Sequence, residues 1–252
     1  MKLLIVGAGE MGRWLADTVD ADVAFTDADP AVAEAAADPR AARAVENDIK
    51  ESFDAVGIAV PMSVVDEAIA TYAPLAEAAV FDLSGVMDRP LAAMADHAPD
   101  CEQASFHPLF APPRVPGNIA VVTATAGPTL ATIHEHMSEA GNTVFETTAA
   151  EHDSAMETIQ AGAHTAVLAY ALVAGDSREE FATPVSERLE SLATTVTEGS
   201  PEVYGEIQAA FDGADDIAAA AQRIADADSE TFADLYAEAK RNVDADSRVS
   251  DE

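Results

Sequence analysis

The sequence predicts an α/β fold: a doubly wound parallel sheet in the first part of the chain, followed by an all-helical domain. Short apolar runs alternate with helical stretches up to residue 148, which is typical of a parallel sheet covered by helices on both faces. After Glu151 only helical periodicity remains, as far as about Arg241. The predicted domains are residues 1–148 and 149–243, and the acidic tail, residues 244–252, is expected to be disordered.

Each element is predicted from its local pattern. Apolar runs bounded by turn residues indicate strands at residues 2–6, 22–26, 54–60, 79–83, 118–122 and 143–146. Helical spacing indicates helices from Met11 to Val19, from Ala31 to about Val45 with a break at Asp38-Pro39, and from Pro128 to Ala140. In the helical domain, glycines mark loops near residues 175–176, 199–201 and 213–215.

The charge of the chain excludes several classes of partner. Its formal net charge is −33, with an isoelectric point near 4.1, so the surface repels nucleic acid and anionic lipid. Such a surface also repels itself unless dense counterions screen it, which predicts adaptation to a salt-rich cytoplasm. No apolar run is long enough for a membrane span, and no signal-peptide cleavage site follows the first residues, so a cytoplasmic protein is expected. The single cysteine, Cys101, excludes an internal disulfide, and we expect an inert buried thiol.

A glycine-rich motif follows the first predicted strand. Gly7-Ala8-Gly9-Glu10-Met11-Gly12 reads G-x-G-x-x-G and opens a predicted helix, which is the context of a Rossmann dinucleotide-binding domain. The first glycine permits the tight turn, the second lets a pyrophosphate approach the backbone, and the third lets helix and strand pack closely. The predicted cofactor-binding residues of this part of the fold are Gly7, Gly9, Glu10, Met11, Gly12 and, at the end of the third strand, Pro61.

An acidic residue stands where the cofactor's ribose would bind. Asp27 ends the second strand, about twenty residues after the first glycine, and a carboxylate there hydrogen-bonds ribose hydroxyls. It would repel the 2′-phosphate of NADP, and no cation follows before Arg40, so the sequence favours NAD. Asp29 is the alternative carboxylate.

Three histidines are candidates for the substrate site. His107, in Ser105-Phe106-His107-Pro108-Leu109-Phe110, is expected on a loop after a strand, where ligands bind in such sheets. His152 opens the long helix of the second domain, and on that helix Gln160 and His164 are one turn apart. His152 and His164 are too far apart along the helix to share a metal, so no metal site is predicted.

The chain resembles the prephenate/arogenate dehydrogenases of tyrosine biosynthesis. The matching segments occur in the family's order and span residues 1 to about 170. They are Gly7 to Gly12, Asp82-Leu83-Ser84-Gly85-Val86-Met87 with Pro90-Leu91, His107-Pro108-Leu109-Phe110, and Glu151-His152-Asp153 with Met156, Ile159-Gln160 and His164. Similarity is weaker in the later helices.

The resemblance implies a Rossmann domain with a helical domain that forms a homodimer. It implies that hydride passes from the ring carbon of prephenate to NAD while the ring carboxylate leaves as carbon dioxide, giving 4-hydroxyphenylpyruvate. It assigns His107 to the substrate hydroxyl, as general base or hydrogen-bond acceptor, and places His152, Gln160 and His164 around the substrate.

The sequence departs from the family at two places. Family members commonly carry Ser-Val-Lys where this chain has Gly85-Val86-Met87, so Ser84 is expected to take over the catalytic serine's role. The arginine that holds a substrate carboxylate in the family has no clean counterpart here. A dianionic substrate in so acidic a protein needs a nearby cation, and the candidates are Arg114 and Arg188.

Three alternatives remain open. Prephenate and arogenate differ only in the side chain, so the sequence does not separate them. A hydroxyacid dehydrogenase or imine reductase combines the same two kinds of domain, but the hydroxyacid enzymes usually carry a catalytic lysine, and the only lysine after residue 50 is Lys240. An NAD-sensing regulator would need no titratable residue beside the nicotinamide, so His107 argues against it.

Overall fold

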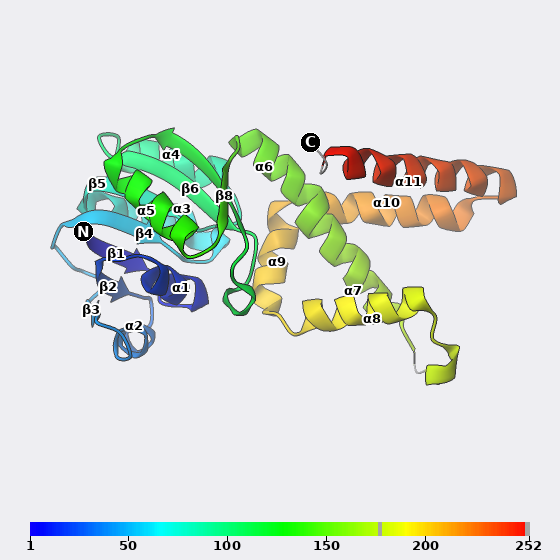
Figure 1. The fold of residues 1–252 in the computed structure, drawn as a ribbon, viewed down its shortest axis with the longest axis horizontal. Helices are drawn as coiled ribbons and strands as arrows, with labels where there is room; N and C mark the ends of the chain where they lie inside the picture. The colour runs from blue at the N-terminus through cyan, green and yellow to red at the C-terminus, as the bar shows by residue number, and fades with distance from the viewer. Residues whose placement is uncertain (176–177, 250–252) are drawn as a thin grey trace. The chain divides into compact units, whose positions relative to one another are not determined.

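The structure, a computed structural model, describes residues 1–175 and 178–249. The chain divides into two compact units, of which the first comprises residues 1–156 and 205–210. The second comprises residues 157–204 and those from 211 onward. Figure 1 shows the sheet of the first unit and the helices of the second. No helix in the described ranges is both long enough and apolar enough to cross a membrane.

The first unit is built on one eight-stranded sheet, ordered β3-β2-β1-β4-β5-β6-β7-β8. Its strands are β1 Lys2–Val6, β2 Asp22–Thr26, β3 Arg43–Ala44, β4 Phe53–Ile58, β5 Ala76–Asp82, β6 Glu102–Pro108, β7 Asn118–Thr125 and β8 Thr143–Glu146. The predicted α/β fold is confirmed, and the apolar runs form the central strands because both faces of the sheet are covered. Alternate residues of β1 serve opposite faces: Leu3 and Ile5 enter one buried cluster, and Leu4 and Val6 the other.

One pair of strands departs from the predicted parallel sheet. β7 runs antiparallel to β6, with His107 opposite Ala120, and β8 is parallel to β7. The segment between β6 and β7 spans residues 109–117, which is too short for the crossover that a parallel pair requires. The expectation that His107 lies on a loop is therefore wrong, because β6 continues through Pro108 to pair with β7.

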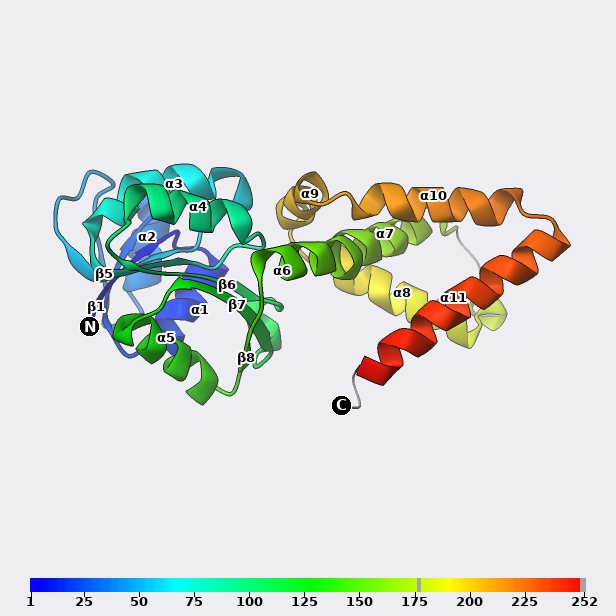
Figure 2. The same cartoon turned by 90° about the horizontal axis from the view of Figure 1, so that it is seen from above.

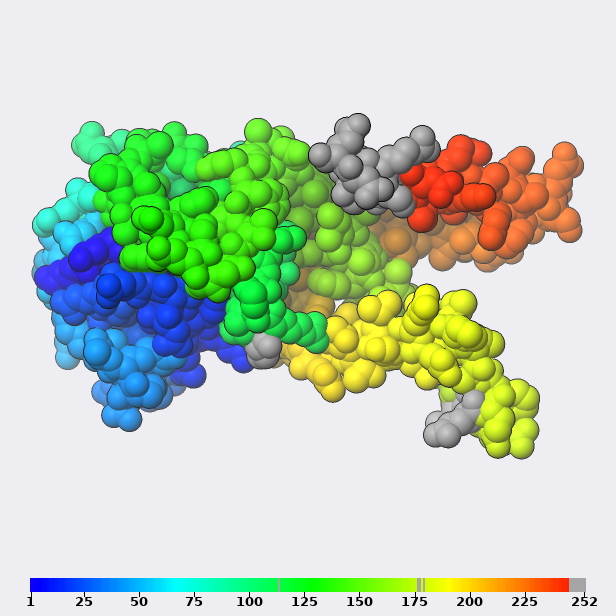
Figure 3. Space-filling model, in the orientation of Figure 1, coloured from blue at the N-terminus to red at the C-terminus, as the bar shows by residue number. Residues whose placement is uncertain are grey.

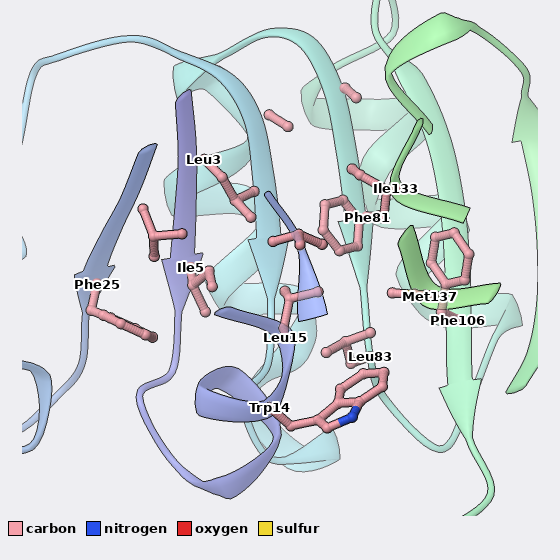
Figure 4. Close-up of a cluster of buried hydrophobic side chains, with 14 of the residues drawn as sticks. Leu3, Ile5, Trp14, Leu15, Phe25, Phe81, Leu83, Phe106, Ile133 and Met137 are labelled. Atoms are coloured by element: carbon pink, nitrogen blue, oxygen red, sulfur yellow. The ribbon is translucent and has the colours of Figure 1, made fainter. Parts of the chain in front are cut away.

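Helices cover both faces of the sheet. They are α1 Glu10–Thr18, α2 Pro30–Ala37, α3 Val65–Tyr72, α4 Asp88–His97, α5 Pro128–Glu139 and α6 Ala149–Met156, with 3-10 turns η1 Met62–Val64, η2 Ala73–Leu75 and η3 Pro112–Arg114. Side chains of α1, α2 and α5 enter the first buried cluster, and those of α3 and α4 enter the second. Figure 2 shows α3 and α4 on one side of the sheet and α1 and α5 on the other. Figure 4 shows Leu15 of α1 and Met137 of α5 among the buried side chains of the first cluster.

The second predicted helix is shorter than expected. It ends at Ala37, and residues 43–44 form β3, which pairs with β2. Pro39 stops the helix because proline has no backbone N–H to donate. A two-residue edge strand has no local signature, so the sequence pattern could not show it.

The second unit is wholly helical in its described part, as the sequence predicts. Its elements are a π-helical segment η4 Glu157–Gly162, α7 Ala163–Val173, η5 Glu179–Phe181, α8 Pro184–Thr197, α10 Gly213–Asp226 and α11 Ser229–Val249. α9 Pro201–Ala210 begins in this unit and ends in the first. A Cβ on Gly213 would lie 1.9 Å from the carbonyl oxygen of Glu157, so glycine permits α10 to pack closely on η4.

Three expectations for the later part of the chain differ from the structure. The loop near residues 213–215 is the first turn of α10. The tail expected to be disordered from residue 244 is helical through Val249, since no proline or glycine interrupts α11, while residues 250–252 lie outside the described residues. The first unit also includes α6, one helix beyond the expected boundary, because α6 packs against α4.

Candidate active site

The glycine turn after β1 is shaped by close backbone approaches. Gly7 has a φ of +96°, and a Cβ there would lie 2.3 Å from the carbonyl oxygen of Ala59. A Cβ on Gly12 would lie 1.9 Å from the carbonyl oxygen of Gly7. A Cβ on Gly9, by contrast, would meet no atom within 4 Å. The first and third glycines therefore permit packing, and the second leaves open space where a pyrophosphate can approach.

The start of α1 suits an anion. Its N-cap is Gly9, which offers no side-chain acceptor to the first amides of the helix. Those N–H groups and the helix dipole favour a phosphate at this position. Glu10 lies exposed in the first turn, and Met11 packs partly against the core. Together with the space over Gly9, this geometry fits a dinucleotide.

Asp27 lies directly after β2, against the glycine turn. Its Oδ2 accepts a hydrogen bond of 2.8 Å from the backbone N–H of Ala8, and its Oδ1 accepts one of 3.0 Å from Asp29. A carboxylate oxygen has two lone pairs, so both oxygens can still accept from ribose hydroxyls. Asp29 caps α2 by accepting from the backbone N–H of Ala31, so its carboxylate already has a structural role.

Pro61 lies exposed at the carboxyl end of β4, where it caps η1. The backbone N–H of Met62 donates to the Glu206 carboxylate at 2.8 Å, which fixes the start of this loop. The carboxyl ends of β1 and β4 lie side by side in the sheet, so Pro61 stands near the glycine turn.

Two histidines from distant parts of the sequence meet in the first unit. Nδ1 of His107, on β6, lies 2.8 Å from Nε2 of His152, on α6. Nδ1 of His152 lies 2.8 Å from Oδ1 of Asp153. We call Asp153, His152 and His107 the relay. The planes of the two imidazole rings make an angle of 74°, and the ring centroids are 5.0 Å apart.

The relay is buried at one end and open at the other. The residues His107 and His152 are 7% and 3% exposed, whereas the side chain of Asp153 is 30% exposed. Burial, and next the neighbouring His152, lower the pKa of His107 to about 3. His107 is therefore neutral throughout the physiological range and can accept a proton or a hydrogen bond.

Glycine at position 85 lies close against His107. A Cβ there would lie 3.5 Å from Nε2 of His107 and 3.0 Å from Sδ of Met62. Gly85 and Met62 therefore border the side of the imidazole that bears Nε2.

Ser84 is held differently from the expectation. Its hydroxyl contacts the carboxyl group of Asp82 and the carbonyl oxygen of Val86, and the residue is 4% exposed. Burial raises the pKa of Asp82 to about 7, although hydrogen bonds from Ser84 oppose the shift. The Ser84 hydroxyl is thus engaged in fixing the turn after β5, a role that does not require contact with a substrate.

The remaining predicted substrate residues fall in both units. Gln160 lies half-buried in η4 of the second unit, and His164 lies in α7 with its ring edge-on to Tyr204, 4.6 Å between centroids. Burial lowers the pKa of His164. Arg114, in the first unit, and Arg188, in the second, are exposed, and neither forms an ion pair with any described residue.

Two features of the site were not predicted from the sequence: the contact of Asp153 with His152 and the π-helical segment around Gln160. Asp153 was visible only as part of a motif, because adjacent helical residues do not ordinarily face each other. The π-helical segment that holds Gln160 has no local signature, although such segments often occur at functional sites. Among the described residues, no three His, Cys, Asp or Glu side chains converge to hold a metal ion.

Known proteins resemble this chain in sequence and in fold. It is 31% identical over 268 residues to the 4-amino-4-deoxyprephenate dehydrogenase of Streptomyces pristinaespiralis, covering 94% of this chain and 88% of that protein. Its fold matches the prephenate dehydrogenase of A. aeolicus in complex with hydroxyphenyl propionate and NAD+, at a TM-score of 0.72 and 14% identity over 99% and 97% of the two chains. It also matches Synechocystis arogenate dehydrogenase, at a TM-score of 0.63 and 17% identity over 98% and 100%. No protein-family model matches the chain.

Proposed function

The chain belongs to the prephenate/arogenate dehydrogenase family, and we propose that it catalyses the NAD-dependent oxidative decarboxylation of prephenate to 4-hydroxyphenylpyruvate. The observation that carries the proposal is the neutral His107, held by His152 with Nε2 toward Gly85. In this reaction a ring carbon loses hydride while its hydroxyl loses a proton, so an acceptor must lie within hydrogen-bond reach. His107 is that acceptor.

The cofactor is held by the glycine turn and Asp27. Gly7, Gly9 and Gly12 shape the turn, and the first amides of α1 bind the pyrophosphate. The Asp27 carboxylate binds the adenosine ribose and repels a 2′-phosphate, so NAD is preferred. When bound, the nicotinamide would supply the hydride acceptor, and Pro61, which follows β4 beside β1, is a candidate contact for the cofactor.

The buried histidine favours a hydroxyl over an amine at the reacting carbon. An alkyl amine is protonated near neutral pH, and transferring an ammonium ion beside a buried neutral imidazole costs desolvation energy. A hydroxyl carries no such penalty. We therefore place prephenate first, with Arg114 of the first unit as the candidate cation for a substrate carboxylate.

A second candidate is the amine analogue. The relative that is 31% identical is named for 4-amino-4-deoxyprephenate, and Nε2 of His107 could accept from N–H as well as from O–H. Arogenate, which keeps the ring hydroxyl, is the third candidate.

The second unit supports a homodimer. α7 is apolar along most of its length and yet contains no buried residue, and Leu172 and Val173 are 86% and 82% exposed. Figure 3 shows open space between α8, drawn in yellow, and the helices α10 and α11, drawn in orange and red. An apolar helix that is this exposed would be costly in water. We propose that a second copy of the chain covers it.

Steady-state kinetics tests the assignment. The purified protein, in high salt, is given prephenate, arogenate or 4-amino-4-deoxyprephenate with NAD or NADP, and reduced nicotinamide is followed by absorbance. We expect the highest kcat/KM with prephenate and NAD. A higher value with the amine would assign the second candidate function, and no turnover with any of the three would refute all of them. Light scattering tests the dimer.

A further inference from the structure

We propose that Asp153 and His152 position His107 and conduct its proton from the buried site to the surface. The proposal rests on the proposed function, in which His107 accepts the substrate proton. It makes Asp153 and His152 positioning residues, without contact with the substrate. Neither residue was assigned this role by the sequence, which placed His152 beside the substrate.

The hydrogen bonds of the relay fix which nitrogen of His107 carries a proton. The carboxylate of Asp153 can only accept, so Nδ1 of His152 donates to it. A neutral His152 then presents Nε2 as an acceptor, and Nδ1 of His107 must be its donor, 2.8 Å away. In a neutral His107 this leaves Nε2 as the acceptor nitrogen, on the side that Gly85 and Met62 border.

The same three groups provide a balanced route for the proton. The substrate hydroxyl gives its proton to Nε2 of His107 while hydride leaves the ring carbon. Nδ1 of His107 then gives its proton to Nε2 of His152, and Nδ1 of His152 gives its proton to Oδ1 of Asp153. Both histidines end neutral, and Asp153, whose side chain is 30% exposed, releases the proton to water. Each histidine must then regain its starting tautomer before the next turnover.

Burial makes such a route necessary. A protonated His107 would be an imidazolium in a buried strand, and its pKa of about 3 shows how strongly the surroundings disfavour that form. Delivery of the proton to a partly exposed carboxylate removes the charge from the buried strand.

The titratable groups on the packed elements are few. β5 contributes Glu77 near its start and Asp82 at its end, where Asp82 is bound to Ser84, and β7 carries no titratable side chain. α6 itself adds Glu151, which accepts from Thr147. α4, which packs on α6, carries Asp88, Arg89, Asp96 and His97. The titration of these groups also contributes to the pH profile of kcat, so the variants are compared with the unmodified protein over the same pH range.

Three variants test the relay in the full-length protein. Asp153→Asn keeps an acceptor for Nδ1 of His152 but cannot take up the proton, so kcat should fall by roughly 10²-fold with KM little changed. In Asp153→Ala, kcat should fall at least as far. Added formate should restore activity to this variant, because a small carboxylate can reach the partly exposed position. Glu151→Gln, which removes a carboxylate one helix position from His152, is the matched control and should leave kcat and KM within about twofold of the unmodified protein.

A readout independent of turnover separates this proposal from the proposed function. Imidazole ¹⁵N shifts should show a protonated Nδ1 and an unprotonated Nε2 on His107, whether or not any substrate is turned over. In Asp153→Ala this preference should weaken. A protonated Nε2 on His107, or an Asp153→Asn variant with the kcat and pH profile of Glu151→Gln, would overturn the relay. If none of the three substrates is turned over but His107 shows a protonated Nδ1 and an unprotonated Nε2, only the proposed function is overturned.

Discussion

Replacing Asp82 by asparagine should remove a large pH dependence of folding. Asp82 is fully buried at the end of β5, and burial raises its pKa from 3.8 to about 7. The unfolded chain therefore loses this proton near pH 4, whereas the folded chain keeps it until about pH 7. Below the unfolded-state pKa, the contribution of Asp82 to the free energy of unfolding has its full value. This contribution falls as pH rises from the unfolded-state pKa to the folded-state pKa, and it does not change further above the folded-state pKa.

The size of the effect follows from the shift. Each pH unit corresponds to about 1.4 kcal/mol, so the shift from 3.8 to about 7 amounts to about 4 kcal/mol of unfolding free energy. Asparagine cannot ionise, and its Oδ1 can still accept a hydrogen bond from the Ser84 hydroxyl. Relative to the unmodified protein, Asp82→Asn should therefore gain about 4 kcal/mol of stability between pH 4 and pH 8.

Denaturant titrations at fixed high salt, at each pH from 4 to 8, measure this difference. The many surface carboxylates also titrate, but their contribution is common to both proteins and cancels in the comparison. Asp88→Asn, at the exposed start of α4, controls for the loss of one negative charge. If Asp82→Asn and the unmodified protein show parallel pH profiles, Asp82 is ionised in the folded state and the reasoning is refuted.

Five further predictions concern the base, the cofactor, the glycine turn and the charge. His107→Asn should lower kcat by roughly 10²–10⁴-fold and leave NAD affinity nearly intact, and near-normal turnover would remove His107 from the mechanism. Because the pKa of His107 is about 3, the kcat profile should show no ionisation of this residue between pH 5 and pH 8, and a loss of activity near pH 6.5 that disappears in His107→Asn would contradict it. Asp27→Ala should weaken NAD binding by roughly 10-fold to 100-fold and narrow the gap to NADP, measured by fluorescence titration; better use of NADP by the unmodified protein would disprove the assignment. Gly9→Ala should fold normally but bind NAD at least about tenfold more weakly, whereas Gly12→Ala should lose about 1–3 kcal/mol or more of stability; equal thermal midpoints for the two variants would count against this division. The net charge of −33 predicts a thermal midpoint that falls on dilution of salt, since the screening length grows from about 3 Å at 1 M to about 10 Å at 0.1 M, and a constant midpoint by circular dichroism would exclude salt adaptation.

Local patterns predicted most of the fold. Continuous apolar runs located most of the buried strands, though not β6, and the glycine spacing located the dinucleotide turn, since both depend on residues close together in the sequence. The patterns failed where a partner strand decided the outcome. β3 is two residues long and exists only through its pairing with β2, and β6 extends through His107 only because β7 returns antiparallel beside it.

The sequence by itself determined the fold class and the family, and it named the candidate site residues. Those properties depend on residue type, order and spacing, which no tertiary contact alters. Only the tertiary structure decided what the side chains do to one another. His107 and His152 are 45 positions apart, and their 2.8 Å contact arises because β6 and α6 meet in the first unit. Ser84 and Asp82, close in sequence, are joined by burial in a turn that excludes water. Proton positions and pKa values follow from distance and desolvation, and both are properties of packing in three dimensions.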